Sequence, residues 1–475
     1  MGFLIYDLIF LALFLIFSSI FLYTRRHNLK KEGLLFLYKT SWGIKLINYL
    51  GRKYRRTLKA LSYVSITMGY LLMIGVFYLI YTIVKVYLFN PSIVRAIKIP
   101  PILPLVPYLP QVFSLDFLPP FYFTYWIVIL AIIAITHEMA HGIFAAYDKV
   151  KIKTTGFGFF PFFLPIFLAA FVELDEKKMA KKSKFKQMVI LSAGTFANVL
   201  TAIFFFLILV IFFSLAFSAS GVVFDSYATS AIMVSGISSV NGIHVNNASY
   251  DKIIELADKE GLNEISANNE TYLATKSSLE NQKEYNGQIL VYNSAPAIKE
   301  NLSSIILEIG GVKIDNLDKL VEELGKYSPG EEVIVKTKTT QGFEEKAITL
   351  EEHPERPGTA WLGIGFTNQE GSSVLGKIMG KLSFKQPWVY YEPKFGEISI
   401  FIYNLLWWII LISVSVALIN MLPVGIFDGG RFFYLTVFAL TKSEKTAKKA
   451  FAFSTYFFLF ILLLLMFFWA FSFIR

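Results

Sequence analysis

The 475-residue chain contains no cysteine and few charged residues. The absence of cysteine excludes disulfide bonds, thiolate nucleophiles and metal or iron–sulfur sites with cysteine ligands. Any metal must therefore be held by histidine, aspartate or glutamate. Only 17% of the residues are charged and 55% are hydrophobic, which lies outside the usual composition of soluble globular domains. The composition indicates a membrane protein.

Six apolar runs are long enough to cross a bilayer as helices, which takes about 20 residues each. The first is interpreted as an anchor rather than a removed signal peptide, because no small-residue cleavage site follows it. The sequence therefore predicts a polytopic α-helical membrane protein with about six transmembrane helices. The runs cover residues 3–23, 61–89, 121–147, 188–217, 398–422 and 450–473.

Lysine and arginine cluster beside these apolar runs, for example at 25–31, 52–56, 177–186 and 442–449. Placing each basic cluster in the cytoplasm orients all six runs without conflict and leaves the N-terminus outside. The net charge of +10 is then explained by membrane orientation, and we expect contact with the lipid bilayer and no nucleic acid partner. We expect a multi-pass protein of the cell membrane.

Residues 220–370 differ in composition, because acids outnumber bases there and strand-like patterns alternate with turn signals. The sequence at 237–247 resembles that at 306–316, and a short amphipathic helical pattern follows each copy. We expect two α+β modules on the extracytoplasmic side; the alternative is one irregular domain with a fortuitous match. The predicted domains are an anchor with a basic cytoplasmic segment (1–60), a membrane core (61–219), the extracytoplasmic region (220–370) and a second part of the membrane core (371–475).

His137 and His141 lie four positions apart, with Glu138 between them. Residues four apart share a helix face, so both imidazoles can reach one Zn²⁺ while Glu138 approaches the open position of the metal. Zinc activates water at neutral pH and a glutamate can accept its proton, so such a site can hydrolyse amides. The alternative is a polar patch that stabilises a helix bundle, which is costly inside a membrane unless it is paired or metallated. At 1.5 Å per residue, the histidines lie roughly 9 and 15 Å along the helix from Tyr147 at its cytoplasmic end, and hence within the bilayer.

A catalytic zinc needs a third protein ligand. From residue 398 onward the acids are Asp428 and Glu444, and Glu444 lies in a basic, solvated loop. Asp428 lies in a segment broken by proline and glycine, residues 420–431, which we expect to re-enter the membrane at the depth of the histidine pair. The alternative is an aspartate that caps a helix starting near Gly430.

The motif His-Glu-x-x-His at 137–141, the motif Asn-x-x-Pro-x-x-x-x-Asp-Gly at 420–429 and the inserted, PDZ-like region resemble the site-2 protease family, the intramembrane zinc metalloproteases of peptidase family M50. The resemblance implies that His137, His141 and Asp428 bind one Zn²⁺ per chain and that Glu138 is the general base. Residues 193–198 look like the family motif Ala-Gly-Pro-x-x-Asn with threonine in place of proline. By that resemblance Asn198 is catalytic and steadies the substrate or the oxyanion; the alternative is an ordinary interhelical hydrogen bond.

The resemblance implies a zinc metalloendopeptidase that cleaves the transmembrane segment of single-span membrane proteins, after an earlier cleavage has removed their ectodomain. The segment Gly-Phe-Gly-Phe at 156–159 resembles the membrane-associated strand region of the family, and an exposed edge there could pair with an unwound substrate. The alternative is a catalytically inactive membrane scaffold with PDZ-like modules and a vestigial metal site. A metal transporter is disfavoured, because polar residues are not spread through successive apolar runs.

Overall fold

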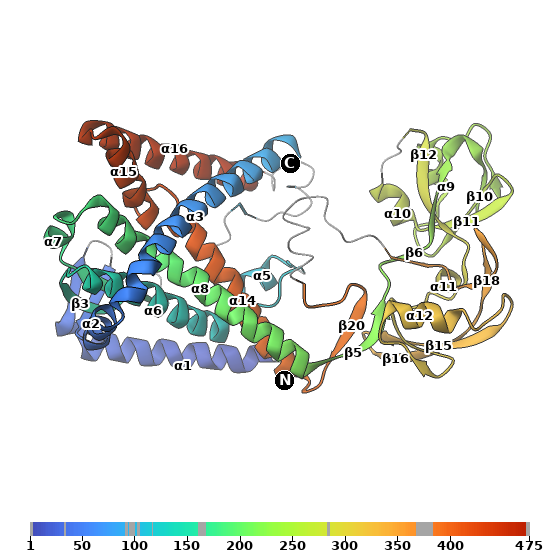
Figure 1. The fold of residues 1–475 in the computed structure, drawn as a ribbon. Helices are drawn as coiled ribbons and strands as arrows, with labels where there is room; N and C mark the ends of the chain where they lie inside the picture. The colour runs from blue at the N-terminus through green and yellow to red at the C-terminus, as the bar shows by residue number, and fades with distance from the viewer. Residues whose placement is uncertain are drawn as a thin grey trace. The chain divides into compact units, whose positions relative to one another are not determined.

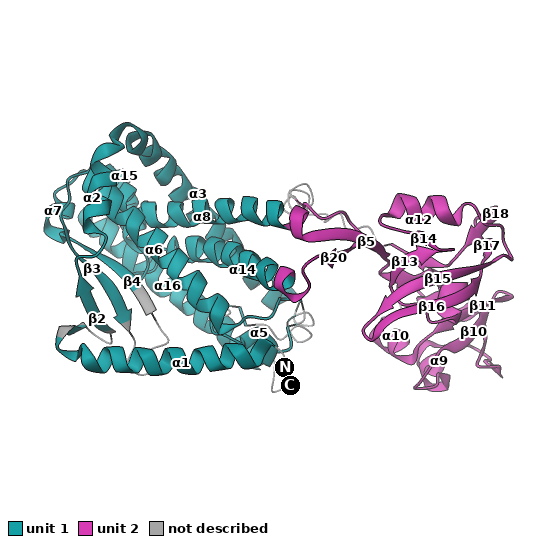
Figure 2. Cartoon of the chain, turned by 90° about the horizontal axis from the view of Figure 1, so that it is seen from below, with its two compact units in different colours: residues 1–212, 400–475 teal, residues 213–399 magenta. Residues whose placement is uncertain are grey.

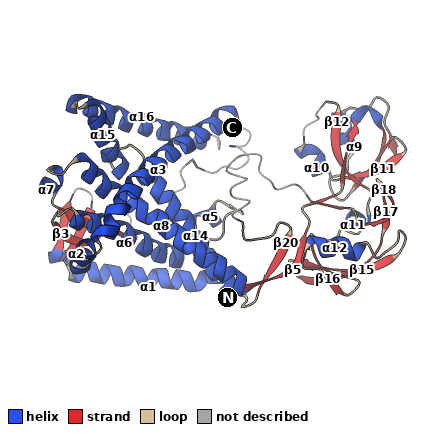
Figure 3. Ribbon diagram, in the orientation of Figure 1, coloured by secondary structure: helices blue, strands red, loops and turns tan. Residues whose placement is uncertain are grey.

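The computed structural model describes residues 3–32, 35–90, 94, 100–101, 105–115, 117–159, 168–282, 286–366 and 383–471. The chain divides into two compact units (Figure 2), of which the first combines residues 1–212 and 400–475 and the second comprises residues 213–399. The first unit is mainly helical and the second contains most of the strands (Figure 3).

Six helices in the described part of the chain are long and apolar enough to cross a membrane, which confirms the number expected from the apolar runs. The six helices are α1 (Phe3–Thr24), α3 (Arg55–Phe89), α6 (Phe123–Tyr147), α8 (Lys184–Ala216), α14 (Glu397–Asn420) and α16 (Glu444–Phe471), labelled in Figure 1. Three of them, α3, α8 and α16, begin four to six residues earlier than predicted, because lysine and arginine at the ends of the runs continue the helix as good helix formers.

Shorter helices complete the first unit: α2 (Ile44–Lys53), α5 (Leu109–Val112), α7 (Glu176–Ala180) and α15 (Asp428–Thr441). Helix α2 packs closely on α6 through small residues. A Cβ atom on Gly51 would lie 2.8 Å from the Cβ of Ala146, and one on Gly142 would lie 2.9 Å from a methyl group of Ile47. Small residues allow such backbone approach between helices, so α2 holds the helix that carries the histidine motif.

An acid in the first apolar helix caps the start of α6. Asp7 is 1% exposed, and its carboxylate accepts hydrogen bonds from the backbone N–H groups of Phe123 (2.7 Å) and Thr124 (2.9 Å) and from the hydroxyl group of Tyr108 (2.6 Å). Phe123 and Thr124 are the first two residues of α6, whose N–H groups have no partner within the helix. Asp7 is the only charged residue in its run, and a lone intramembrane acid is the sequence signal for such a role.

A four-stranded antiparallel sheet also belongs to the first unit, in the order β1 (Leu29–Glu32), β2 (Leu35–Thr40), β3 (Ile152–Phe159) and β4 (Leu168–Leu174). The strand region expected at 156–159 lies in β3. This strand pairs with β2 on one side and with β4 on the other, so the nearby edge of the described sheet is at β4 and not at the predicted segment. Glu173 on β4 accepts hydrogen bonds from Lys39 on β2 and Thr154 on β3, both at 2.9 Å. These two bonds lower the pKa of Glu173 to about 2. The ionised carboxylate therefore links β2, β3 and β4 through hydrogen bonds.

The second unit contains two larger sheets, each with its own buried apolar core. One sheet has the order β7 (Thr229–Met233), β12 (Gln288–Asn293), β11 (Glu270–Ala274), β10 (Asn263–Ala267), β8 (Ile237–Val240) and β9 (Ile243–His244). The other has the order β16 (Gly342–Thr349), β15 (Glu332–Thr339), β13 (Ile305–Ile309), β5 (Phe217–Val223) and β20 (Val389–Pro393), with β14 (Val312–Lys313) paired to β13.

The repeat in the sequence is also a repeat in the structure. Strands β8 and β9 form a hairpin that precedes helix α9 (Tyr250–Leu256), and β13 and β14 form a hairpin that precedes α12 (Leu317–Leu324). Both two-residue turns, Asn241-Gly242 and Gly310-Gly311, have positive φ at each position, as a type I′ hairpin requires. The PDZ-like character of the modules and their location outside the membrane stay predictions.

Candidate metal centre

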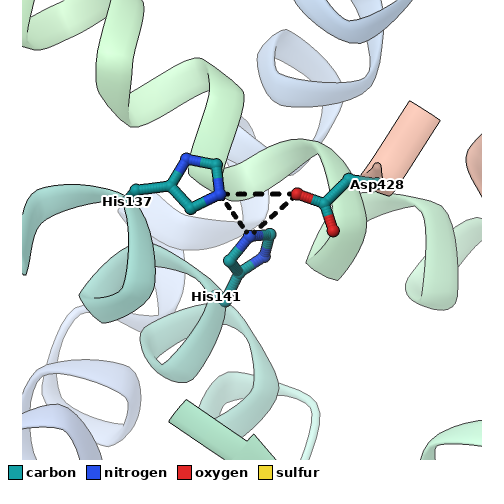
Figure 4. Close-up of side chains that lie close together, drawn as sticks. All are labelled: His137, His141 and Asp428. Carbon is teal, nitrogen blue, oxygen red and sulfur yellow. Dashed lines mark hydrogen bonds and ion pairs between the residues drawn. The ribbon is translucent and has the colours of Figure 1, made fainter. Parts of the chain in front are cut away.

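His137, His141 and Asp428 converge at one point (Figure 4). The Nε2 atoms of the two histidines are 3.0 Å apart, and Oδ2 of Asp428 lies 3.4 Å from Nε2 of His137 and 3.2 Å from Nε2 of His141. Ligand atoms about 2.1 Å from a tetrahedral zinc ion lie about 3.4 Å from one another. The three side chains therefore have the spacing of a metal ligand set.

Both histidines also have a contact at the second ring nitrogen, away from this point. Nδ1 of His141 lies 2.6 Å from the backbone carbonyl oxygen of Ile190, and Nδ1 of His137 lies 3.0 Å from the side-chain amide of Asn198. Ile190 and Asn198 both belong to α8. Contacts of this kind fix the orientation of metal-binding imidazoles, and here they leave both Nε2 atoms directed at Asp428.

Helix α8 leaves room beside the histidines because residue 194 is glycine. A Cβ atom on Gly194 would collide with Nε2 of His141 and lie 2.6 Å from Nε2 of His137. A side chain at residue 194 would therefore fill the space in which a metal ion could contact both Nε2 atoms. The space, the ligand spacing and the donor types together fit a zinc ion.

The segment that carries Asp428 depends on two glycines. Residues 421–427 connect α14 to α15 without helical structure, and α15 begins at Asp428 itself. A Cβ atom on Gly429 would lie 2.6 Å from Cα of Met421, and one on Gly430 would collide with the backbone of Val424. The Asp-Gly-Gly sequence therefore lets the connecting segment fold against the start of α15. The expected re-entry of this segment into the membrane stays a prediction.

The Asp428 carboxylate faces the histidines and does not cap a helix. The residue preceding α15 is Phe427, and no side-chain hydrogen bond caps this helix. Oδ2 of Asp428 instead approaches both Nε2 atoms. The geometry thus favours a ligand over the alternative of a capping aspartate near Gly430.

Glu138 lies beside the histidine pair and is held by the sheet. Its Oε2 atom accepts a 2.8 Å hydrogen bond from the backbone N–H of Val172 on β4. Alternate residues of a strand direct their backbone groups to the same side, so the groups of Ala170 face the same edge as the N–H of Val172. The glutamate and the edge of β4 are therefore neighbours.

A cavity of about 760 Å³ gives access to the site. It is lined by His137, Glu138, His141 and Asp428 together with Ala170 and Val172 of β4 and apolar residues of α6 and α8. Charged residues also line it, including Lys153 and Glu173. Arg431 and Glu176, whose side chains form a 2.7 Å ion pair, complete this charged part of the wall. The cavity therefore joins the three candidate ligands, an acid and a strand edge.

The structure brings together four of the residues expected from the sequence, His137, Glu138, His141 and Asp428, at the cavity wall. Asn198 contacts His137 but is 0% exposed and is not among the described residues that line the cavity. The sequence reasoning did not single out Gly194. It lies within the motif at 193–198, so a glycine inside an apolar helix was the available signal.

Comparison with known proteins agrees with this site. The family model described as peptidase family M50 matches residues 125–465, well over half of the chain, and this range contains every residue of the site. No curated protein sequence matches the chain. The match, the apolar helices and the converging His, His and Asp side chains agree with one another. The chain is therefore a multi-pass membrane protein that belongs to peptidase family M50, the site-2 protease family of intramembrane metalloproteases.

Proposed function

We propose that the chain is a zinc metalloendopeptidase that cleaves the transmembrane segment of membrane-anchored proteins. The observation that carries this proposal is that candidate ligand atoms of His137, His141 and Asp428 lie within 4.8 Å of one another. A glutamate lies beside them, on the same helix as the two histidines. Zinc held there would supply Lewis acidity for activation of water and of the peptide carbonyl group. The remaining chemistry belongs to the side chains of this chain.

In this proposal Glu138 is the general base, which accepts a proton from the attacking water and passes it to the leaving amine. Its hydrogen bond to Val172 occupies one carboxylate oxygen, and the residue lines the cavity, so the other oxygen would take the proton. Because the same bond joins Glu138 to β4, the base is placed relative to any peptide that binds along that strand.

The edge of β4 supports a role in substrate binding. A transmembrane helix hides its peptide bonds in internal hydrogen bonds, so the substrate must unwind before cleavage. An unwound segment could add to the edge of β4 as a further strand, next to Ala170 and Val172 in the cavity wall. The peptide bond would then lie beside both Glu138 and the metal ligands.

The orientation of the chain follows from the basic clusters beside its helices. With those clusters in the cytoplasm of a cell-membrane protein, the site lies within the bilayer toward the cytoplasmic side and the second unit lies outside. We propose single-span membrane proteins as substrates, cleaved after their ectodomain has been shortened, as regulated intramembrane proteolysis requires.

The proposal is tested with purified full-length protein in detergent, by elemental analysis and by cleavage of a tagged single-span protein with a short ectodomain. Wild-type protein should contain one zinc per chain, and His137→Ala should lose it. Glu138→Gln should keep zinc and fold, since the amide has the same shape but cannot take a proton. Its cleavage rate should fall at least about 100-fold.

Two results would contradict the proposal. Stoichiometric zinc in His137→Ala would remove the ligand assignment, and near-normal cleavage by Glu138→Gln would mean that another group is the base. Wild-type protein that binds zinc without cleaving any of a panel of such substrates would favour the alternative, a scaffold with a vestigial metal site.

A further inference from the structure

Asn198 is a fully buried polar side chain in an apolar helix, and its position does not suit contact with a substrate. Asn198 is 0% exposed. The described residues that line the cavity include Asn420 but not Asn198. The amide nitrogen of Asn198 contacts Nδ1 of His137 at 3.0 Å, and its Oδ1 atom is buried without a hydrogen-bond partner among the described residues. An amide in this position can act on the reaction only through the histidine.

The chemistry of metal binding decides which atom of the amide faces His137. Nε2 of His137 is directed toward Nε2 of His141 and Oδ2 of Asp428, so Nε2 is the atom that can bind zinc. A neutral imidazole that binds metal through Nε2 carries its proton on Nδ1. Nδ1–H needs an acceptor, which the NH₂ group of Asn198 cannot provide.

Rotation of the Asn198 amide by 180° exchanges its oxygen and nitrogen without moving any other atom, and the two orientations are distinguished only by their hydrogen bonds. With the oxygen toward His137, Nδ1–H donates to Oδ1 of Asn198. His141 has the equivalent arrangement, with Nδ1 2.6 Å from the carbonyl oxygen of Ile190. Both imidazoles would then donate from Nδ1 to an acceptor on α8.

We infer that Asn198 is a positioning residue of the zinc site: its side-chain oxygen accepts the Nδ1 proton of His137, fixes the tautomer with Nε2 free, and orients the ring toward the metal. This inference rests on the proposed zinc site and gives Asn198 a role different from contact with the substrate or the oxyanion. Helix α8 thus orients both histidines of α6, through a backbone carbonyl and a side-chain amide.

The test measures zinc affinity of the full-length protein by competition with a chelator. Asn198→Leu keeps the size of the side chain and removes the acceptor, so the dissociation constant for zinc should rise about 10- to 100-fold, as for loss of other groups that orient a ligand. Asn198→Asp retains an acceptor oxygen and should bind zinc within a few-fold of wild type. This difference between two side chains of similar size would not arise from packing alone.

Thr201→Val provides the matched control. Thr201 lies three residues further along α8, is 7% exposed, and its hydroxyl contacts that of Thr136 on α6 at 3.4 Å. The variant therefore removes a neighbouring polar contact between the same two helices without touching a histidine, and its zinc affinity should be unchanged. Equal weakening in Asn198→Leu and Thr201→Val would overturn the inference and leave Asn198 with an ordinary interhelical role.

The ¹⁵N chemical shifts of His137 in wild-type protein, assigned by comparison with His137→Ala, keep the inference testable if a variant fails to fold. We expect Nδ1 to be protonated and Nε2 to shift when zinc is added. A His137 with Nδ1 bound to zinc, or unchanged zinc affinity in Asn198→Leu, would overturn the inference while the zinc site itself stands. Failure of the zinc-site assignment itself is a separate outcome, which would be recognised by stoichiometric zinc in His137→Ala.

Discussion

At the scale of single residues, the candidate metal site depends as much on an absent side chain as on its three candidate ligands. Gly194 lies in α8, where alanine favours the helix by about 1 kcal/mol relative to glycine. A Cβ atom there would occupy space next to Nε2 of both histidines. Gly194→Ala should therefore force the two imidazole rings out of these positions, so that zinc and cleavage activity are lost while the membrane helices still fold. Thermal unfolding and elemental analysis of the same sample measure both effects.

Gly75→Ala is the control for this substitution. Gly75 also lies in an apolar helix, α3, and a Cβ atom there would approach only the flexible end of Leu418, at 3.3 Å. Zinc content should be normal in Gly75→Ala. Full zinc occupancy with wild-type affinity in Gly194→Ala would contradict the placement of the metal beside α8.

The residues of the site differ in how far the sequence could predict them. His137, Glu138 and His141 lie on one helical turn, so their spacing alone indicates a shared site. Asp428 was predicted because few acids occur near the end of the chain. The requirement at Gly194 could not be predicted in this way, since it arises from the packing of α8 against α6, which local spacing does not describe.

At the scale of secondary-structure elements, α1 contributes to the start of α6, the helix that carries the histidine motif. The carboxylate of Asp7 binds two N–H groups at the N-terminus of α6, where negative charge is also favoured by the helix dipole. Asp7→Leu would leave these buried donors without an acceptor, at a cost of about 1–3 kcal/mol. We expect a lower unfolding temperature for Asp7→Leu and a smaller decrease for Asp7→Asn, measured by thermal unfolding in detergent.

Ser18→Ala is the control for this prediction, because Ser18 is the other buried polar residue of α1. Its unfolding temperature should remain close to that of wild type. Equal stability of Asp7→Leu and wild type would show that the contact between α1 and α6 contributes nothing to folding.

Elements defined by local pattern were predicted, and elements defined by distant pairing were not. Each membrane helix corresponds to an apolar run that can be recognised by itself. Strands β1 and β2 were missed because they are short and because β2 pairs with β3, more than 100 residues away in the chain. The repeat in the second unit was recognised in the sequence but its hairpins were not predicted, although each turn contains the glycine that a two-residue turn favours.

At the scale of the whole molecule, the candidate chemistry is confined to the first unit. His137, Glu138, His141 and Asn198 lie before residue 212, and Asp428 lies after residue 400. Among the described residues of the second unit, no group of three His, Asp or Glu side chains has the spacing of a metal site. The second unit should therefore be dispensable for zinc binding, and its contribution should concern which substrates reach the site.

The chain offers a defined way to remove most of the second unit. Strands β5 and β20 connect it to α8 and α14, and Val222 is paired with Val389 in their antiparallel ladder. The N–H of Val223 also donates to the carbonyl oxygen of Trp388 at 2.7 Å. Residue 223 can therefore be joined to residue 388 by an Asn-Gly turn, which suits a two-residue hairpin, so that residues 224–387 are removed and the β5–β20 pairing is kept.

We predict that this shortened enzyme binds one zinc per chain and cleaves single-span substrates whether or not they retain a folded ectodomain, whereas the full-length enzyme cleaves only those with a short one. The reason is that in the proposed orientation the second unit lies outside the membrane, where it would exclude bulky ectodomains from the site. Cleavage of paired substrates that differ only in the ectodomain measures the effect, and Glu138→Gln in the shortened enzyme shows whether the same site is responsible. A shortened enzyme that binds zinc and cleaves the short substrate but still rejects the long one would contradict the filter, and would leave the second unit a role in holding α8 and α14 at their spacing.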